Sequence, residues 1–288
     1  MKNPFLNATG FDPEDLLSRT HQVILPSPNG HQPPPIPEIN GVLRVGVDLG
    51  TTYTVLVVLD AHNNPVAGEY RFTQIVRDGL VVDYIGAVRI LREMKHNLES
   101  RLGRTLTHAA SGYPPGVPQA EVQSTANVVE AAGMICTSLV DEASAANNVL
   151  GLKDGVIVDI GGGTTGIAVL QAGQVVHTAD EATGGTHMSL VIAGGADISF
   201  EAAEVQKTDR AQQSRLFPIV RPVMEKMATI IVQHIRGFSA DSIVLVGGSS
   251  LFPGIDRVIE AITGLPTRVT PHPLFVTPVG IAMNNQAE

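Results

Sequence analysis

The sequence is poor in cysteine, in long apolar runs and in positive charge. Its single cysteine, Cys136, can form neither an intramolecular disulfide nor a thiolate metal site. No apolar run approaches the ~20 residues that a membrane-spanning helix needs. The N-terminus also lacks the charged start and continuous apolar core of a secretory signal peptide. We therefore expect a soluble protein of the reducing cytoplasm.

Positive charge is scarce, with 19 Lys and Arg against 28 Asp and Glu and a formal net charge of −9. The scattered cations form no basic footprint for nucleic acid. A phosphate-bearing ligand would then have to be held by backbone N–H groups and a metal ion. The nine histidines show no H-x-x-x-H spacing, so the sequence offers no histidine metal site.

Residues 1–41 differ in composition from the rest of the chain. Prolines at 26, 28, 33, 34, 35 and 37 remove backbone donors and favour an extended, solvated chain. We expect a largely disordered tail that contains a short helix after Asp12, with Leu16 and Leu17 on its apolar face. Whether this helix is a docking peptide or part of a floppy tail stays open.

Two segments far apart in the sequence share one pattern. "VDLGTTYT" (47–54) and "VDIGGGTTG" (158–166) each place an aspartate at the end of an apolar strand, before a glycine turn with two threonines, and a second apolar strand follows. Each copy is expected to form an antiparallel hairpin. A structural turn gives no reason to repeat the carboxylate, so the duplication predicts two similar α/β lobes with a shared chemistry.

The residues of these turns suit a phosphate site with a metal. Glycines allow consecutive N–H groups to converge on phosphate oxygens, and threonine hydroxyls add neutral donors. Asp48 and Asp159 would repel phosphate unless a cation lay between them. Mg²⁺ fits, because it binds few carboxylates, keeps its waters and bridges phosphates. The pattern predicts that the two aspartates hold a metal through water beside a nucleotide.

A third turn, "VLVGGSSLFPG" (244–254), follows another apolar strand. Gly247 and Gly248 would let a ribose or a flat ring approach the backbone, and Ser249 offers a hydroxyl. A tight strand-to-helix connection explains this segment equally well.

The three turns, in this order, resemble the actin/Hsp70/sugar-kinase ATPase superfamily, as the first phosphate loop, the second phosphate loop and the adenosine loop. "LVDEASAANNVLG" (139–151) and "TPVGIAMN" (277–284) resemble its two connecting helices. The resemblance implies a two-lobed α/β fold with ribonuclease H-like lobes, mixed sheets and an interlobe nucleotide cleft. The first lobe would span 42–150 and the second 151–288, with the C-terminus returning to the first lobe.

The resemblance also implies a set of site residues. Asp48, Asp159 and Glu142 would be catalytic, the aspartates near the metal and Glu142 orienting the attacking water. Glu204 and Lys207, in "FEAAEVQK", would contact adenine and ribose. On residue type alone, Glu142 could be a solvated helix residue, and the Glu204–Lys207 pair a surface ion pair. The remaining cofactor-binding positions are Gly50, Thr51, Thr52, Tyr53, Gly161, Gly162, Gly163, Thr164, Thr165, Gly247, Gly248 and Ser249.

Within the superfamily, "RVGVDLGTTYTVLVVLD", "AASGYPPGV" and "SLVDEASAANNVLGLKDGVIVDIGGGTTGIAVL" resemble the EutJ family, the small Hsp70-like proteins of ethanolamine-utilisation gene clusters. The resemblance implies an ATP- and Mg²⁺-dependent chaperone that serves the enzymes or shell of a bacterial microcompartment. The chain departs from the chaperones in two respects. Lys95 lies in surroundings unlike those of their γ-phosphate lysine, and no peptide-binding domain follows the second connecting helix.

These departures keep two other functions open. One is a nucleotide-dependent scaffold or adaptor with negligible hydrolysis, like the actin relatives of bacterial cell division and pilus assembly. The other is a small-metabolite kinase, which would need a catalytic aspartate that the sequence does not offer convincingly.

Overall fold

The computed structural model describes residues 12–26, 33–36, 39–73, 75–77 and 80–286. The chain forms two compact units. The first contains residues 1–151 and 274–288, and the second contains residues 152–273. The chain thus leaves the first unit once and returns to it for its last helix.

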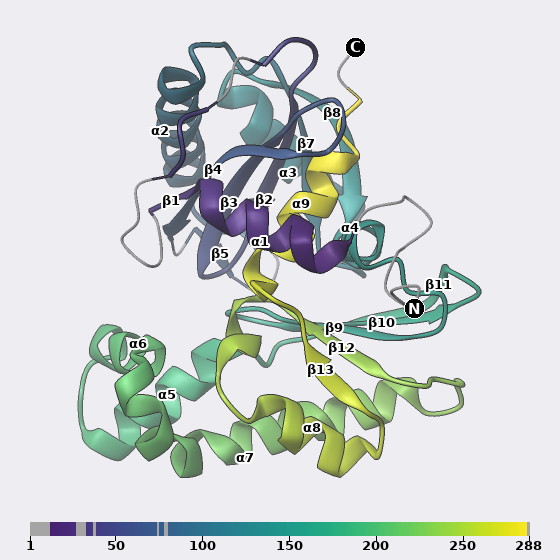
Figure 1. Ribbon diagram of the computed structural model, residues 1–288. Coiled ribbons are helices and arrows are strands. Elements are labelled where there is room, and N and C mark those ends of the chain that lie inside the picture. Colours follow the sequence, from purple (N-terminus) through teal and green to yellow (C-terminus); the bar gives the residue numbers. More distant parts are fainter. Residues whose placement is uncertain (1–11, 27–32, 37–38, 74, 78–79, 287–288) are drawn as a thin grey trace. The chain divides into compact units, whose positions relative to one another are not determined.

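The first unit is built on a six-stranded mixed sheet (Figure 1). Across the sheet, the strands are β1 (Ile24–Leu25), β4 (Pro65–Phe72), β3 (Tyr53–Leu59), β2 (Arg44–Leu49), β7 (His108–Tyr113) and β8 (Ile135–Asp141). β2 and β3 form the expected antiparallel hairpin, with Asp48 opposite Val55. A separate two-stranded ribbon, β5 (Val76–Arg77) with β6 (Leu80–Val81), precedes the first long helix.

Helices cover both faces of this sheet. α2 (Tyr84–Leu102) and α3 (Gln119–Ala131) bury an apolar stripe that includes Leu91 and Met94 against Val45 and Val47 of β2. On the opposite face, α9 (Val276–Met283) packs on α4 (Glu142–Leu150), β2 and β7. Gly46 of β2 makes this close approach possible, because a Cβ there would lie 2.5 Å from the backbone of α9.

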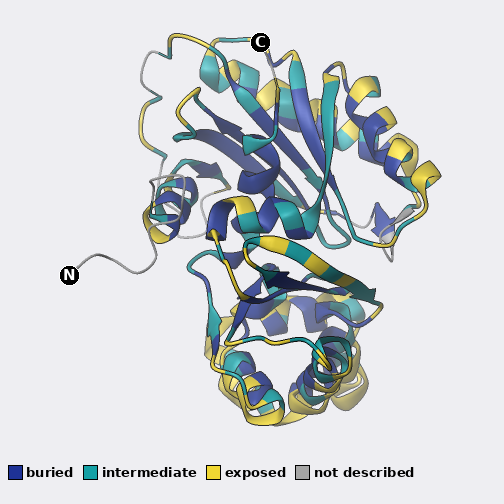
Figure 2. Cartoon of the chain, turned by 90° about the vertical axis from the view of Figure 1, so that its right-hand side faces the viewer, coloured by how far each residue is buried: buried dark blue, intermediate teal, exposed yellow. Residues whose placement is uncertain are grey.

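The second unit has a five-stranded mixed sheet with helices over its core. Its strands, in order, are β11 (Gln174–Glu181), β10 (Thr165–Gln171), β9 (Gly155–Ile160), β12 (Ile243–Val246) and β13 (Thr267–Val269). The α-helices are α5 (Gly185–Ala196), α6 (Phe200–Thr208), α7 (Arg210–Ile235) and α8 (Ile255–Thr263). The second unit also contains a short 3₁₀ turn, η1 (Gly248–Leu251), and another, η2 (Pro273–Phe275), lies where the chain returns to the first unit. Figure 2 shows buried residues concentrated along the strands and the helix faces toward them.

The predicted duplication is visible in the sheet topology. Strand order β4-β3-β2-β7-β8 in the first unit matches β11-β10-β9-β12-β13 in the second. In both, the first three strands along the chain pair antiparallel and the last two join in parallel. Each unit therefore repeats one supersecondary arrangement, and β1 is an addition that only the first unit has.

The helix expected after Asp12 is present as α1 (Pro13–Val23), with Asp12 Oδ1 accepting from the Glu14 N–H at 2.9 Å. Leu16 and Leu17 are buried, and α1 packs on β4. Residues 13–25 are thus structured, unlike the expected disordered tail, because the two leucines have a surface to bury against. Residues 1–11, 27–32 and 37–38 lie outside the described part of the chain.

One of the two expected connecting helices has other bounds in the structure. The segment 139–151 is not one helix, since β8 runs to Asp141 and α4 begins at Glu142. In the second unit, α7 begins at Arg210, and Pro218 and Pro222 lie inside it. None of the helices in the described part of the chain combines the length and apolar character that a membrane crossing requires.

Candidate functional site

The two duplicated turns have the same backbone geometry. In the first unit, the Gly50 N–H donates to the Tyr53 carbonyl at 3.0 Å. In the second, the Gly161 N–H donates to the Thr164 carbonyl, also at 3.0 Å. Each turn thus reverses the chain over four residues, directly after the strand that carries the aspartate.

The threonine pairs of the two turns are not equivalent, which corrects the alignment drawn from the sequence. Because the two turns superpose from their first glycine, Thr54 rather than Thr52 corresponds to Thr165. Thr54 Oγ1 lies 3.1 Å from Thr73 Oγ1, and Thr165 Oγ1 donates to the Thr183 carbonyl at 2.5 Å. Both threonines are fully buried. Thr165 therefore ties its loop to the end of β11 and is not exposed as a phosphate donor.

In the first unit, the strands bring Asp48 and Glu142 to the same face of the sheet. Asp48 alternates with Gly46, so its side chain lies on the face that α9 covers. Val47 pairs in parallel with Ser111 of β7, and Gly112 is the next residue of that strand. Glu142 begins α4, and its Cγ lies 3.7 Å from where a Gly112 Cβ would be. Glycine at 112 therefore leaves room for Ile281 of α9 and for the Glu142 side chain on this face.

In the second unit, Asp159 lies against the third turn. Asp159 pairs with Val246, the last residue of β12, and a Cβ at Gly247 would collide with its Oδ1. Gly247 has φ = 84°, a conformation that favours glycine. Ser249 Oγ donates to the Gly161 carbonyl at 2.8 Å. The turns after β9 and β12 thus form one cluster around Asp159.

The first turn of α5 joins this cluster. The Gly185 and Thr186 N–H groups donate to the carbonyls of Gly161 and Gly162 at 3.0 and 2.8 Å. A Cβ at Gly185 would collide with Ser249 Oγ and would lie 3.3 Å from Lys207 Nζ. The loop carbonyls are thus engaged by α5, and the segment depends on glycine for its close packing.

Glu204 and Lys207 form a buried ion pair beside α5 and not a surface pair. Lys207 Nζ donates to Glu204 Oε2 at 2.7 Å and to the Gly185 carbonyl at 3.2 Å. Ser189 Oγ donates to the same carboxylate oxygen at 2.5 Å. Burial lowers the pKa of Lys207, and the Glu204 carboxylate opposes that shift. Two charges held out of water beside a glycine-rich turn are typical of a functional site.

Sequence analysis missed part of this arrangement. Gly184, Gly185 and Ser189 lie at the contact between loop, helix and ion pair, and Gly112 lies beside Glu142 in the first unit. The repeated glycines in "TGGTH" (183–187) were a signal for the first two. Nothing in the sequence marked Ser189, because its role depends on the packing of α5 on α6.

The predicted residues divide between the two units. The first unit holds Asp48, Gly50, Thr51, Thr52, Tyr53 and Glu142. The second holds Asp159, Gly161, Gly162, Gly163, Thr164, Thr165, Glu204, Lys207, Gly247, Gly248 and Ser249. Lys95, on α2, is paired with Glu99 at 2.6 Å.

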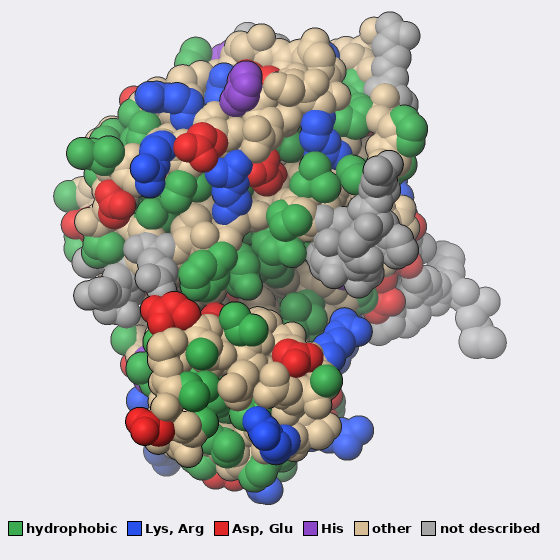
Figure 3. Space-filling view, turned by 90° about the vertical axis from the view of Figure 1, so that its left-hand side faces the viewer, with side chains coloured by type: hydrophobic (Ala, Val, Ile, Leu, Met, Phe, Trp, Pro, Cys, Tyr) green, Lys and Arg blue, Asp and Glu red, His purple; other side chains and the backbone are tan. Residues whose placement is uncertain are grey.

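The donor set suits a hydrated divalent cation with a phosphate ligand. Within the described ranges, no group of three or more His, Cys, Asp or Glu side chains could hold a metal ion. Mg²⁺ commonly needs only one or two carboxylates, with waters and phosphate oxygens completing its shell. On the face drawn in Figure 3, Lys and Arg side chains are interspersed with Asp and Glu side chains. Backbone N–H groups of the glycine turns therefore remain the candidate phosphate donors.

The chain is similar in sequence to several known proteins. A family model described as "Type IV pilus assembly protein PilM" matches residues 120–277. The chain is 42% identical over 247 residues to the ethanolamine utilization protein EutJ of Salmonella typhimurium, covering 85% of this chain and 87% of that protein. It is 21% identical over 261 residues to the chaperone protein DnaK of Thermus thermophilus, covering 67% of this chain and 42% of that protein.

Solved structures show the same architecture. The EutJ crystal structure from Carboxydothermus hydrogenoformans has a TM-score of 0.87 and 42% identity, covering 94% of this chain and 97% of that one. A PilM–PilN type IV pilus biogenesis complex has a TM-score of 0.70 at 15% identity, with coverages of 86% and 98%. MreB5 of Spiroplasma citri bound to AMPPNP has a TM-score of 0.68 at 18% identity, with coverages of 85% and 96%.

Proposed function

Because the chain belongs to the EutJ family of ethanolamine utilization proteins, we propose that it binds Mg·ATP through its two duplicated turns. Over residues 120–277 it also belongs to the family described as type IV pilus assembly protein PilM, and it has the actin-like ATPase fold. The observation that carries this proposal is the repeated pairing of a strand-ending aspartate with the same four-residue glycine turn. AMPPNP bound to MreB5, which shares the fold, supports a nucleotide ligand.

The two turns and the buried ion pair would contact different groups of the nucleotide. The Gly50–Tyr53 turn and the Gly161–Thr164 turn would donate backbone N–H groups and hydroxyls to phosphate oxygens. Glu204 and Lys207 would contact the nucleoside, with the turn at Gly247 close to it. Their buried position supports this role, because a fixed carboxylate can accept from ribose hydroxyls without being repositioned.

The acidic residues would hold the cation and the water. Asp48 and Asp159 would each accept hydrogen bonds from cation-bound waters, and Glu142 would orient a further water. Mg²⁺, when bound, neutralises phosphate charge that the acidic chain cannot neutralise itself. The position of Glu142 beside Gly112, on the same sheet face as Asp48, supports its assignment to the water.

The cellular role we propose is that of an Hsp70-like chaperone acting on ethanolamine-utilisation enzymes or on microcompartment shell proteins in the cytoplasm. The likeness to EutJ supports the pathway, and the likeness to DnaK supports the chaperone activity. The chain covers 42% of the length of that DnaK.

Binding is tested by calorimetry and thermal unfolding with Mg·ATP. At 100 times its dissociation constant, a ligand adds about 2.7 kcal/mol to the free energy of unfolding. This corresponds to about 2–4 °C per kcal/mol in melting temperature for a chain of this size. Asp159→Asn is expected to reduce the shift and Arg221→Gln to leave it intact. No binding and no shift at millimolar Mg·ATP would contradict the proposal.

A nucleotide-dependent adaptor is the second candidate, favoured by the PilM family match and by the likeness to the PilM–PilN complex. Such an adaptor would bind Mg·ATP but release phosphate no faster than its Asp159→Asn variant. A chaperone ATPase would lose phosphate release in Asp159→Asn and would suppress aggregation of ethanolamine-utilisation enzymes only with ATP. The two measurements together separate the candidates.

A further inference from the structure

The first unit carries a short N-terminal segment on the edge of its sheet. This segment, the strap, comprises residues 12–25 with α1 and β1. β1 pairs in parallel with β4, Ile24 opposite Gly68 and Leu25 opposite Glu69 (Figure 1). Leu16, Leu17, Thr20 and Ile24 are almost fully buried. The strap thus docks by an amphipathic helix followed by an added strand.

Over the residues that the structure describes, the second unit has the same strand arrangement without a counterpart of β1. The second unit ends its sheet at β11, the counterpart of β4, with no strand added beyond it in the described chain. Its five strands still form a complete sheet with a continuous core. β4, as the counterpart of the edge strand β11, would be the edge of its sheet without β1. The strap occupies this edge.

The strap is bound mainly through hydrogen bonds to its backbone and through packing of its apolar side chains. Arg101 Nη2 donates to the Val23 carbonyl at 3.3 Å, and Arg101 Nη1 donates to the Gly68 carbonyl at 3.4 Å. Gly68 leaves space for Ile24, whose Cγ1 would lie 2.9 Å from a Cβ at that position. Backbone pairing with pockets for selected side chains is how sheet edges recognise peptides.

The helical part of the strap reaches the start of α9. The His21 ring lies 6.2 Å from the Phe275 ring, and Tyr70 of β4 lies 5.9 Å from the same ring. Arg19 Nη1 donates to Asn64 Oδ1 at 3.0 Å. The docking surface, which we call the strap groove, therefore consists of Asn64, Gly68, Tyr70, Arg101 and Phe275.

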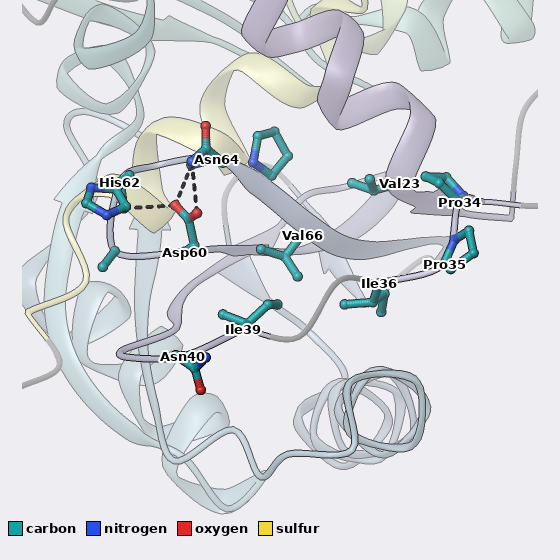
Figure 4. A pocket seen from close by; sticks show the side chains of 12 residues that line it. Val23, Pro34, Pro35, Ile36, Ile39, Asn40, Asp60, His62, Asn64 and Val66 are labelled. Atoms are coloured by element: carbon teal, nitrogen blue, oxygen red, sulfur yellow. Dashed lines mark hydrogen bonds between the residues drawn. The ribbon is translucent and has the colours of Figure 1, made fainter.

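The connection from the strap to β2 is long and rich in proline. Residues 26–43 contain six prolines, so the strap is tethered by a chain with few backbone donors of its own. Pro34, Pro35 and Ile36 of this connection, with Val23, face the β3–β4 turn across a pocket of about 260 Å³ (Figure 4). A segment anchored at one end by such a tether can leave its site without unfolding the sheet.

We propose that the strap groove is an exchangeable peptide-docking site, which the chain's own strap fills in the absence of a partner. The partner presents a short amphipathic helix with two adjacent aliphatic anchors, as in Leu16–Leu17. After about two helical turns comes a β-branched residue that pairs with Gly68. Binding of this partner displaces the strap. Peptide bound in the strap groove is measured with no nucleotide added.

The test places a protease site between Asn29 and Gly30 of the full-length protein. After cleavage, a fluorescent peptide of residues 11–27 is added and its anisotropy is followed. Exchange into the cleaved protein, with little uptake by the uncut protein, is the expected result. An unlabelled Leu17→Asp peptide should compete at least about tenfold more weakly than the wild-type peptide, and Glu14→Gln, on the exposed face, should compete normally.

A second variant keeps the proposal testable if cleaved protein precipitates. Full-length Leu17→Asp, folded by circular dichroism, should bind the labelled wild-type peptide, whereas the wild-type chain should not. A folded variant that takes up no peptide would overturn the proposal. So would a strap that never exchanges, or dimers formed by mutual strap exchange, since the occupant would then be a second copy.

Discussion

The Glu204–Lys207 ion pair places two charges almost out of solvent, with side-chain exposures of 11% and 9%. Removing one partner of such a pair leaves the other charged and unpaired in a poorly polarisable environment. We expect Lys207→Met to lower the free energy of unfolding by about 3–5 kcal/mol, measured by urea denaturation. Ser189 keeps its hydrogen bond to the carboxylate, which places the effect toward the lower value.

Two variants serve as controls for Lys207→Met. The Arg221–Glu225 pair has the same kind of partners but exposures of 57% and 44%, so Arg221→Met should change stability by less than about 1 kcal/mol. The double variant Lys207→Met, Glu204→Gln should recover part of the loss, because the unpaired charge is gone. If Lys207→Met and Arg221→Met behave alike, the pair is solvated in solution.

Gly247 is the residue on which the position of Asp159 depends. A Cβ there would lie 2.6 Å from the Ile160 carbonyl and would collide with the Asp159 carboxylate. Gly247→Ala should therefore lower stability by about 1–3 kcal/mol and weaken Mg·ATP binding, both measurable by calorimetry. Gly194→Ala, which points into open space on α5, is the matched control and should be neutral or stabilising. Equal affinities in the two variants would contradict the role of Asp159.

At the scale of the hairpins, the two threonine pairs have separate roles. Thr165→Val removes the hydroxyl that donates to the Thr183 carbonyl and leaves that carbonyl buried without its donor. We expect a loss of about 1–3 kcal/mol in unfolding free energy. Thr51→Val lies in the turn and should instead weaken Mg·ATP binding with little change in stability. A Thr165→Val variant of normal stability but poor affinity would reverse this assignment.

Much of the element pattern could be predicted from the sequence. The two hairpins are marked by apolar strands on either side of a glycine turn, and the structure confirms them. The register of the two turns could not be predicted, because both glycine and threonine repeat within a few residues. The register depends on hydrogen bonds of the Gly50 and Gly161 N–H groups, which cannot be inferred from the residue types alone.

Docking and helix boundaries escaped prediction for similar reasons. Leu16 and Leu17 look the same in a floppy helix and in a docked one, and only the open edge of β4 decides between them. α7 runs from Arg210 to Ile235 with Pro218 and Pro222 inside it, although proline favours the first turn of a helix over its interior. A proline lacks its N–H donor, but tertiary packing of Leu216 and Val220 offsets the missing bond.

At the scale of the whole molecule, the first unit is discontinuous in sequence whereas the second is continuous. The chain crosses from the first unit to the second after Gly151 and returns at Leu274. The returning segment forms α9, in which seven of eight residues, Val276 to Ala282, are buried. A Cβ at Gly280 would collide with the Ala145 carbonyl of α4, so the two helices pack backbone to backbone. The first unit therefore cannot be complete until the second has been synthesised.

A chain that ends at Pro273 tests this dependence. Without α9, the face of β2 around Gly46 and the small residues of α4 lose their apolar cover, so we expect the first unit to unfold. The second unit has its own core and should keep its amide protection, measured by hydrogen exchange. A chain ending at Asn285 retains α9 and its contact to His108 and should behave as the full-length protein. Adding a peptide of residues 274–288 should restore protection in β2 and β7, because the missing interface is local to α9. If the first unit stayed protected without α9, its fold would depend on the sheet and α2 alone, and the burial of α9 would add little to its stability.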